Sequence, residues 1–418
     1  MPRPAVFFPI AFHLILLAAN PASHAADAPA PVSERARRLT ADALVFDGHN
    51  DLPWHLREQG DVAFGKLDLA RSLTGGHTDI PRLKSGGLKA QFWSVYIPSE
   101  HPAPARTVVQ QIDIVHRMIE RYPETFALAV TADDVEKAVA AGKIASLIGI
   151  EGGVAIENDL AQLRAFARLG VRYMTLTHNS TLDWADAAID KPTHGGLSPF
   201  GERVVREMNR LGMLVDISHV SPDTMRDALR ISRAPVIASH SNAFAICPHP
   251  RNVPDDVLRE LAKNGGVVGI NFYSGFVTPR AAEHTRAIRE ELKKKHPDPA
   301  DFDKAFDAWL DEHPVPRATV VEVVDHIDHI VKTAGIDHVG LGSDFDGITS
   351  TPEGLDDVAT FPRLTDELLR RGYSEGDIRK ILGLNFLRAL RKAGEVADEL
   401  RRTTPPEVDQ PKPRTDRR

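Results

Sequence analysis

The sequence predicts an α/β protein of the (β/α)8 TIM-barrel type, with a helical insertion after the seventh strand. Three observations favour this fold class. Eight short apolar runs alternate with helical patterns along the chain. Strands that alternate with helices pair in parallel. Eight such units in about 350 residues favour a closed barrel over an open doubly wound sheet.

Residues 1–25 have the composition of a signal peptide. Arg3 supplies a short positive segment, residues 5–19 are largely apolar, and Ser-His-Ala at 23–25 offers small residues before a cleavage point. The apolar run is interrupted and too short for a comfortable membrane span, which disfavours the alternative of an uncleaved anchor. We therefore expect an exported protein, periplasmic or secreted, with no stable membrane anchor after signal cleavage.

Residues 26–402 are expected to form one domain, because barrel folds of this length occur as single domains. The proline-rich, charged residues 403–418 are expected to be disordered. Cys247 is the one cysteine, so the chain cannot form an internal disulfide. The formal net charge of −7 offers no basic patch, and nucleic acid is therefore not an expected partner.

The predicted strands are short apolar runs, each bounded by polar or turn-forming residues. In chain order they cover residues 44–46, 90–97, 145–150, 171–177, 213–217, 236–239, 267–272 and 338–342. Helical periodicity covers 106–121, 159–169, 200–211, 222–231, 254–264, 317–334, 363–371 and 376–393. Ser198-Pro199 and Ser221-Pro222 mark two helix starts, because serine caps a helix and proline fits its first position.

The segment 275–317, after the seventh predicted strand, is too long for a plain connection. Its sequence EELKKKHPDPADFDKAFDAWLDEHP has a helical composition. A solvated helical hairpin, a lid over the site and a homodimer contact are the interpretations that remain open.

Seven of the eight predicted strands end in residues that could bind a metal or a substrate. The carboxyl ends of barrel strands converge on the face that carries the active site in this fold. These residues are His49 and Asp51, Glu151, His178 and Asn179, Asp216 and His219, Ser239 and His240, Asn271 and Tyr273, and Asp344 and Asp346. One such residue could simply bond a loop, but seven strand ends together favour a metal site.

His49 and Asp51 lie two residues apart, which places both side chains on one face of an extended strand. With His219, His240 and Glu151 they make five donors, whereas one tetrahedral zinc ion uses three or four. Two zinc ions therefore fit the set better than one, with Glu151 as the bridging carboxylate. A water shared by both ions would be acidic enough to serve as hydroxide near neutral pH.

Six segments of the sequence resemble the membrane dipeptidase (renal dipeptidase) family of zinc peptidases. In the order of the family they are DGHNDLPW, IEGG, DISHVS, ASHSNAFAICPHPRN, NFY and GSDFDG. The resemblance extends from Leu44 to Arg391, nearly the whole chain after the signal peptide. It implies an amidohydrolase-type barrel and a binuclear zinc metallo-dipeptidase, a hydrolase whose partners are dipeptide substrates.

The resemblance also implies a role for each matched metal donor. His49 and Asp51 would hold one zinc ion, and His219 and His240 would hold the other. Glu151 and a hydroxide would bridge the two ions.

Four further residues take roles in catalysis and substrate binding from the same resemblance. His178 would polarise the substrate carbonyl and steady the oxyanion. Arg251 and Tyr273 would contact the carboxylate end of the substrate, and Asp344 would shuttle the proton. The chemistry agrees, since an arginine fork grips a free carboxylate and a carboxylate can carry a proton.

Tryptophans 54, 93 and 184 are expected near the rim of the same site, where they could wall the pocket or simply pack. We also predict that Asp47 and Asp346 form hydrogen bonds near the strand ends rather than contact substrate.

Two other function classes compete with a dipeptidase. Lactonases, phosphotriesterases and deaminases of the amidohydrolase type usually carry a His-x-His pair on the first strand, which the His49-x-Asp51 pair disfavours. A binding protein that kept the barrel and lost catalysis is disfavoured by the intact donor set and Asp344.

Overall fold

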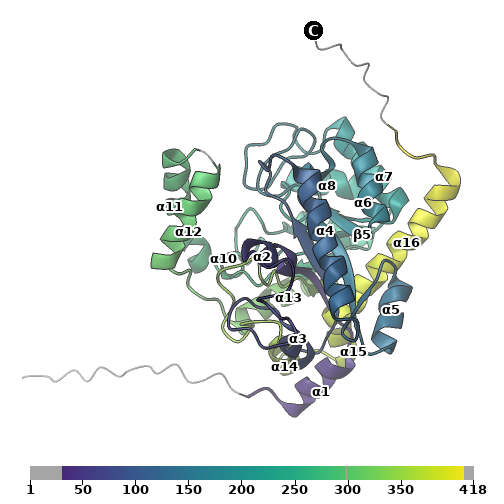
Figure 1. Cartoon of the computed structure of the whole chain (residues 1–418). Helices are drawn as coiled ribbons and strands as arrows, with labels where there is room; N and C mark the ends of the chain where they lie inside the picture. The colour runs from purple at the N-terminus through teal and green to yellow at the C-terminus, as the bar shows by residue number, and fades with distance from the viewer. Residues whose placement is uncertain (1–30, 298, 409–418) are drawn as a thin grey trace, which may run out of the picture. The chain divides into compact units, whose positions relative to one another are not determined.

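Eight parallel strands close into a barrel within the unit Val32–Arg418 (Figure 1). The computed structural model describes residues 31–297 and 299–408. The predicted signal peptide and residues 409–418 of the predicted tail lie outside the described residues. Among the described residues, no helix is both long and apolar enough to cross a membrane.

The barrel strands have hydrogen-bonded neighbours all the way round, because β2 pairs with β4 and the last strand pairs with the first. In barrel order they are β1 (Val45–Asn50), β2 (Leu88–Tyr96), β4 (Ile144–Glu151), β5 (Val171–Thr175), β6 (Leu214–Asp216), β7 (Val236–Ala238), β8 (Val267–Ile270) and β9 (Val339–Leu341). All eight were predicted, and the predicted fold class is confirmed. A ninth strand, β3 (Phe126–Leu128), pairs with the start of β4 and was not predicted.

The seam between β1 and β9 has a short ladder. A single residue pair, Asp47 with Leu341, registers these two strands, whereas seven pairs register β2 with β4. The Asp51 amide donates to the Phe345 carbonyl at 2.9 Å. The Asp47 carboxylate accepts from the amide of Ser343 at 2.8 Å and from its hydroxyl at 2.6 Å. Hydrogen bonds from side chains and from loop backbone therefore add to the short β1–β9 ladder in closing the barrel.

Helices cover the outside of the barrel. They are α1 (Glu34–Asp42), α2 (Leu52–Glu58), α3 (Ile80–Ser85), α4 (Pro104–Arg121), α5 (Ala132–Ala140), α6 (Leu160–Arg168), α7 (Pro199–Leu211), α8 (Pro222–Ile231), α9 (Asp255–Asn264), α13 (Val320–Ala334), α14 (Phe361–Arg370), α15 (Glu375–Arg379) and α16 (Asn385–Thr403). Both predicted caps are confirmed, because Ser198 accepts from the Gly201 amide and Ser221 from the Thr224 amide.

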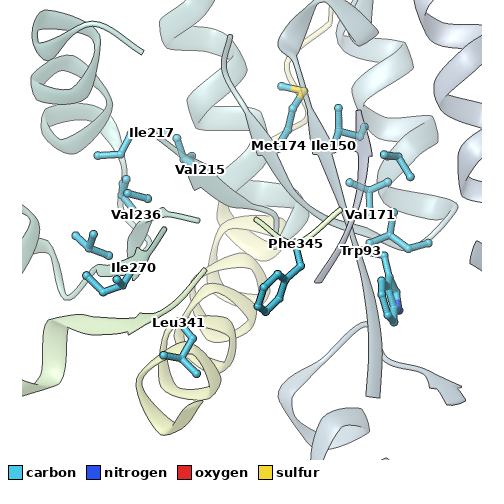
Figure 2. Close-up of a cluster of buried hydrophobic side chains, with 14 of the residues drawn as sticks. Trp93, Ile150, Val171, Met174, Val215, Ile217, Val236, Ile270, Leu341 and Phe345 are labelled. Carbon is cyan, nitrogen blue, oxygen red and sulfur yellow. The ribbon is translucent and has the colours of Figure 1, made fainter. Parts of the chain in front are cut away.

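The largest buried cluster lies between the strands and the helices. Figure 2 shows its strand residues, which include Trp93 on β2, Ile150 on β4 and Leu341 on β9. Helix residues such as Val115 and Leu258 belong to the same cluster. Burial of this apolar surface is the main force that holds the helices on the barrel.

The predicted helical insertion follows β8 and consists of α10 (Ser274–Val277), α11 (Pro279–Lys295) and α12 (Pro299–Glu312). In the α11–α12 hairpin, the Arg289 guanidinium lies over the rings of Phe302 and Phe306, at 5.4 and 4.8 Å from their centroids. The helical content of the insertion is confirmed, and its role as a lid or a dimer contact stays a prediction.

Candidate metal centre

The five predicted metal donors converge at the carboxyl ends of the strands. His49 lies in β1, Asp51 follows that strand, and Glu151 is the last residue of β4. His219 and His240 follow β6 and β7. Each of the five is at most 7% exposed, so these polar groups are removed from bulk water and need partners within the site.

Glu151 divides its two carboxylate oxygens between two groups of donors. Its Oε2 lies 3.5 Å from His49 Nε2. Its Oε1 lies 3.0 Å from His219 Nε2 and 3.4 Å from His240 Nε2. Close groups of potential ligand atoms form on both sides, one with His49 and Asp51 and one with His219 and His240, and a third joins His49, His240 and Asp344. A bridge between two cations requires this division of oxygens.

The outer nitrogens of the three histidines are held by hydrogen-bonding groups. His49 Nδ1 lies 2.8 Å from the hydroxyl of Tyr173, and His240 Nδ1 lies 2.8 Å from that of Ser239. His219 Nδ1 lies 3.2 Å from Asn179 Oδ1. Each ring therefore turns its Nε2 toward Glu151, as partners of this kind do for histidines that bind metals.

The inner atoms of the site fit cations. The Nε2 atoms of His219 and His240 lie 2.9 Å apart, so either one ring donates a hydrogen bond to the other or both lone pairs face a shared cation. His49 Nε2 and Asp51 Oδ1 are buried without a hydrogen-bond partner in the described part of the chain. Nitrogen and carboxylate donors suit a borderline metal such as zinc.

The protonation of these groups also suits a cation. Burial raises the pKa of Glu151, but the charge of His49 and the hydrogen bonds of His219 and His240 outweigh it and hold the pKa well below its ordinary value. Burial lowers the pKa of His219 and that of His240 well below the usual value. An ionised carboxylate and neutral imidazoles are the forms that bind metal, which describes Glu151, His219 and His240. His49 differs, because its burial is outweighed by Tyr173, Asp51 and Glu151, which raise its pKa well above the usual value.

Asp344 stands beside the donors, with Oδ1 3.9 Å from His49 Nε2. Its Oδ2 accepts a hydrogen bond from Asn271 Nδ2 at 2.8 Å. Burial raises the pKa of Asp344 to about 7. A carboxyl group that titrates near neutral pH can take up and release a proton during a reaction.

Two residues of the site have left-handed backbone conformations. The φ angle is 68° at His219 and 64° at Asp344, and neither residue is glycine. Such conformations cost about 1–3 kcal/mol and persist where the surrounding structure enforces them. The backbone at Gly347 also lies close to the site, because a Cβ on this residue would be 2.2 Å from Asp51 Oδ2.

Arg251 points two unsatisfied donors into a buried region. The residue is 2% exposed, and its Nη2 donates to the His240 carbonyl at 3.4 Å. Its Nε and Nη1 atoms have no hydrogen-bond partner among the described residues. Burial lowers the pKa of Arg251 to about 10, so the guanidinium stays charged at neutral pH. A buried cation with free donors is suited to an anionic ligand.

His178 and Tyr273 also reach this region. His178 Nε2 lies 3.9 Å from Glu151 Oε1, and burial lowers the pKa of His178 to about 4. The Tyr273 ring stacks edge-on against Phe276 at 4.8 Å, and Arg251 lies over the same Phe276 ring at 5.2 Å. All nine sequence-predicted site residues are thus gathered at one end of the barrel.

Two of the three tryptophans expected at the rim are core residues. Trp93 and Trp184 are 0% and 1% exposed and belong to the cluster between strands and helices. Trp93 packs edge-on against Phe126. Trp54 is half-buried and packs against Tyr96, whose ring also contacts His178.

Tyr173, which orients His49, is the partner that the sequence did not reveal, whereas Asn179 and Ser239 were among the predicted strand-end residues. Tyr173 lies within an apolar strand and gave no sign of its contact with His49. Gly149 was the available signal, because a Cβ there would lie 2.0 Å from the Tyr173 ring. A glycine inside a buried strand often marks such a close approach.

Comparison with known proteins agrees with this geometry. The sequence model of the membrane dipeptidase family, peptidase family M19, matches residues 33–404. The dipeptidase verJ of Clonostachys rogersoniana is 40% identical to this chain over 382 residues, which cover 88% of this chain and 89% of that protein.

Solved structures show the same similarity. The probable dipeptidase PvdM from Pseudomonas aeruginosa superposes with a TM-score of 0.76 at 27% identity, covering 87% of this chain and 98% of that one. A metallopeptidase from Rhodobacter sphaeroides, solved with a phosphinate mimic of the dipeptide L-Ala-D-Ala, gives 0.69 at 28% identity, covering 84% and 100%. The match along nearly the whole sequence therefore shows that this chain belongs to the membrane dipeptidase family, peptidase family M19.

Proposed function

We propose that this chain hydrolyses the peptide bond of dipeptides with two zinc ions, one held by His49 and Asp51 and one by His219 and His240. Glu151 bridges the two positions in this proposal. The observation that carries it is the division of the Glu151 oxygens between two groups of buried donors.

Zinc, when bound, would polarise the scissile carbonyl and lower the pKa of nearby water. The protein's own groups supply the remaining steps. His178, with its low pKa, would donate a hydrogen bond from a neutral ring to the carbonyl oxygen as that oxygen becomes negative. Asp344 would take the proton of the attacking water and return it to the leaving amine.

The proposed substrate ends shortly after the cleaved bond. The Nε and Nη1 donors of Arg251 would hold the free carboxylate of a dipeptide, with Tyr273 alongside. The Rhodobacter sphaeroides relative binds a mimic of L-Ala-D-Ala, and we extend this to propose that L,D-dipeptides are among the substrates here. Hydrolysis rates on paired L,L- and L,D-dipeptides test this extension.

Export to the periplasm or the medium is part of the proposal. The composition of residues 1–25 supports it. Mass measurement of the mature protein from a fractionated culture should show cleavage after Ala25, and an intact cytoplasmic product would contradict it.

Metal content tests the centre directly. The purified protein under zinc-replete conditions should contain two zinc ions per chain, and Glu151→Ala should lower occupancy at both positions because a bridge serves both. Glu100→Ala is a matched control, since Glu100 is an exposed carboxylate that bonds Ser180. One ion or none in the wild type would exclude the binuclear centre, and loss of a single ion in Glu151→Ala would make Glu151 a terminal ligand.

A further inference from the structure

Asp216 is a buried carboxylate outside the proposed donor set. It ends β6 and is 0% exposed. Its Oδ1 accepts from the amides of Ser239 at 2.8 Å and Ser218 at 3.0 Å. Its Oδ2 accepts from the hydroxyls of Ser239 at 2.6 Å and Thr175 at 2.5 Å. Four donors from three neighbouring strands and their ends therefore fix this side chain.

The Ser239 hydroxyl connects Asp216 to His240. A hydroxyl has one proton, and at its 2.6 Å contact with Asp216 Oδ2, an oxygen that also accepts from Thr175, the Ser239 hydroxyl donates that proton. At its 2.8 Å contact with His240 Nδ1 the hydroxyl must then accept. The proton of the imidazole is therefore on Nδ1, and Nε2 presents a lone pair toward Glu151.

Asp216 with Ser239 forms a carboxylate–serine clamp, and Asp47 with Ser343 forms a second one. Their comparison shows that the contact with a histidine ring belongs to the first clamp. Asp47 holds the amide and the hydroxyl of Ser343 at 2.8 and 2.6 Å, just as Asp216 holds those of Ser239. Each serine directly precedes a residue of the site, Asp344 in one case and His240 in the other. The Ser343 hydroxyl, however, contacts the His49 carbonyl, and it meets no ring nitrogen of the described residues.

We propose that Asp216 is a positioning residue of the metal centre, which fixes the tautomer and orientation of His240 through the Ser239 hydroxyl. This inference rests on the proposed function, because it assumes that His240 Nε2 binds an ion. Asp216 touches neither substrate nor ion in this arrangement. It acts through the hydrogen bonds from Ser239 to Asp216 and from His240 to Ser239. The carboxylate can only accept, and this determines which group donates in each bond.

The direction of these hydrogen bonds predicts that Asp216→Asn changes the tautomer of His240. The amide oxygen can keep the backbone bonds from Ser239 and Ser218, which leaves the NH2 group in the place of Oδ2. That NH2 group would donate to the Ser239 hydroxyl, so the hydroxyl would donate in turn to His240 Nδ1. The His240 proton would then move to Nε2, where it blocks an ion.

The tautomer is measured on metal-free protein by nitrogen NMR of 15N-histidine-labelled chains, with His240→Gln to assign the signal. Wild type should show His240 protonated at Nδ1, and Asp216→Asn should show it protonated at Nε2. The Asp47→Asn variant is the matched control, since it neutralises the other clamp and should leave the His240 tautomer unchanged. Protonation of His240 at Nδ1 in Asp216→Asn would overturn the proposal.

Zinc titration against a competing chelator gives the second measurement. In Asp216→Asn, one of two ions should bind about 10–100-fold more weakly, the usual cost of losing a partner of a metal-bound histidine, and the other should bind normally. Equal affinity of both ions in variant and wild type would also overturn it. If the wild type binds no zinc, the proposed function fails, while the NMR result still decides the role of Asp216.

Ser239→Ala keeps the proposal testable if Asp216→Asn does not fold, which circular dichroism will show. This variant keeps the Asp216 carboxylate and removes only the connecting hydroxyl. We expect a mixture of both His240 tautomers and an intermediate loss of affinity for one ion. A pure Nδ1 tautomer with unchanged zinc affinity would show that the hydroxyl does not act as the connection.

Discussion

In the proposed function Asp344 carries the proton, and its position and raised pKa agree with that role. Its Oδ1 is 3.9 Å from His49 Nε2, farther than Asp51 Oδ2 at 3.2 Å, and Asn271 holds its other oxygen. Asp344→Asn should therefore keep both zinc ions and lower kcat by about 10²–10⁴-fold, the usual cost of losing a general acid–base group. Zinc content and turnover are the measurements, with the exposed Asp356→Asn as control. Loss of zinc would instead make Asp344 a ligand.

Arg251 should make activity depend on a free substrate carboxylate. A hydrogen bond to a charged group contributes about 1.5–3 kcal/mol, so amidation of the dipeptide should lower kcat/KM by about 10–100-fold in the wild type. In Arg251→Met, free and amidated dipeptides should react at equal, low rates. If amidation costs as much in the variant as in the wild type, another group holds the carboxylate.

At the scale of single residues, the sequence revealed the inner donors of the site but not the contact of Tyr173 with His49. His49, Glu151 and His240 could be predicted because they stand at strand ends, which converge in any barrel. Tyr173 could not, because its contact with His49 crosses the barrel between strands far apart in sequence. Side-chain partners of that kind depend on register and packing, which short motifs do not encode.

At the scale of elements, Gly149 leaves room for the Tyr173 ring. Gly149→Ala places a Cβ 2.0 Å from an atom of the fully buried Tyr173 ring. Overpacking of this kind costs about 1–3 kcal/mol, and the free energy of unfolding in urea should fall by at least that amount. Gly394→Ala in α16 is the matched control, since its Cβ would meet nothing within 4 Å and alanine favours a helix. Equal stability of both variants would contradict the tight approach.

A neutral His326 connects α13 with the segment after β7 and with α10. From α13, its Nδ1 accepts from the Ala243 amide at 3.1 Å and its Nε2 donates to the Val277 carbonyl at 2.8 Å. Burial lowers its pKa to about 4. The unfolded chain takes up a proton below about pH 6.5 whereas the folded chain does not, so this histidine stabilises the fold above pH 6.5 and the contribution is lost as the pH falls.

His326→Gln should be less stable than wild type at pH 7.5, and the difference should shrink by about 2 kcal/mol by pH 5. Urea unfolding at several pH values measures both chains. A difference that stays constant from pH 7.5 to 5 would show that His326 titrates alike in the folded and unfolded states.

The eight barrel strands and the long helices could be predicted, whereas β3 and the short helices could not. Periodicity needs two or three turns to emerge, and α2 and α3 have seven and six residues. α5 carried a readable signal, because Thr131 and Asp134 form a capping box at its start. The predicted helix 376–393 is two helices joined by a π turn at Lys380–Leu384, and α16 continues to Thr403.

At the scale of the whole molecule, the centre concentrates negative charge. Five buried carboxylates, Asp47, Asp51, Glu151, Asp216 and Asp344, lie around it, and Arg251 is the only buried arginine or lysine among the described residues. Uncompensated buried charges are costly, so cations should contribute to the stability of the fold.

Removal of metal should therefore lower the melting temperature. A ligand at 100 times its Kd stabilises a protein by about 2.7 kcal/mol per site, which corresponds to several degrees for two sites. Calorimetry before and after chelation, with zinc added back, measures the shift. Recovery with zinc but not with magnesium is expected for these nitrogen-rich donors, and an unchanged melting temperature would contradict a structural contribution.

The short seam between β1 and β9 has a consequence for how the chain folds. His49 and Asp51 lie on one side of the seam and Asp344, the proposed proton carrier, on the other, so the first and last strands must meet before Asp344 stands beside the donors. Contacts this distant in sequence form late, because the entropy of closing a long loop opposes them. We therefore expect zinc to bind after the barrel has closed and to slow its reopening. The amides of β1 and β9 should then exchange hydrogen faster once zinc is removed.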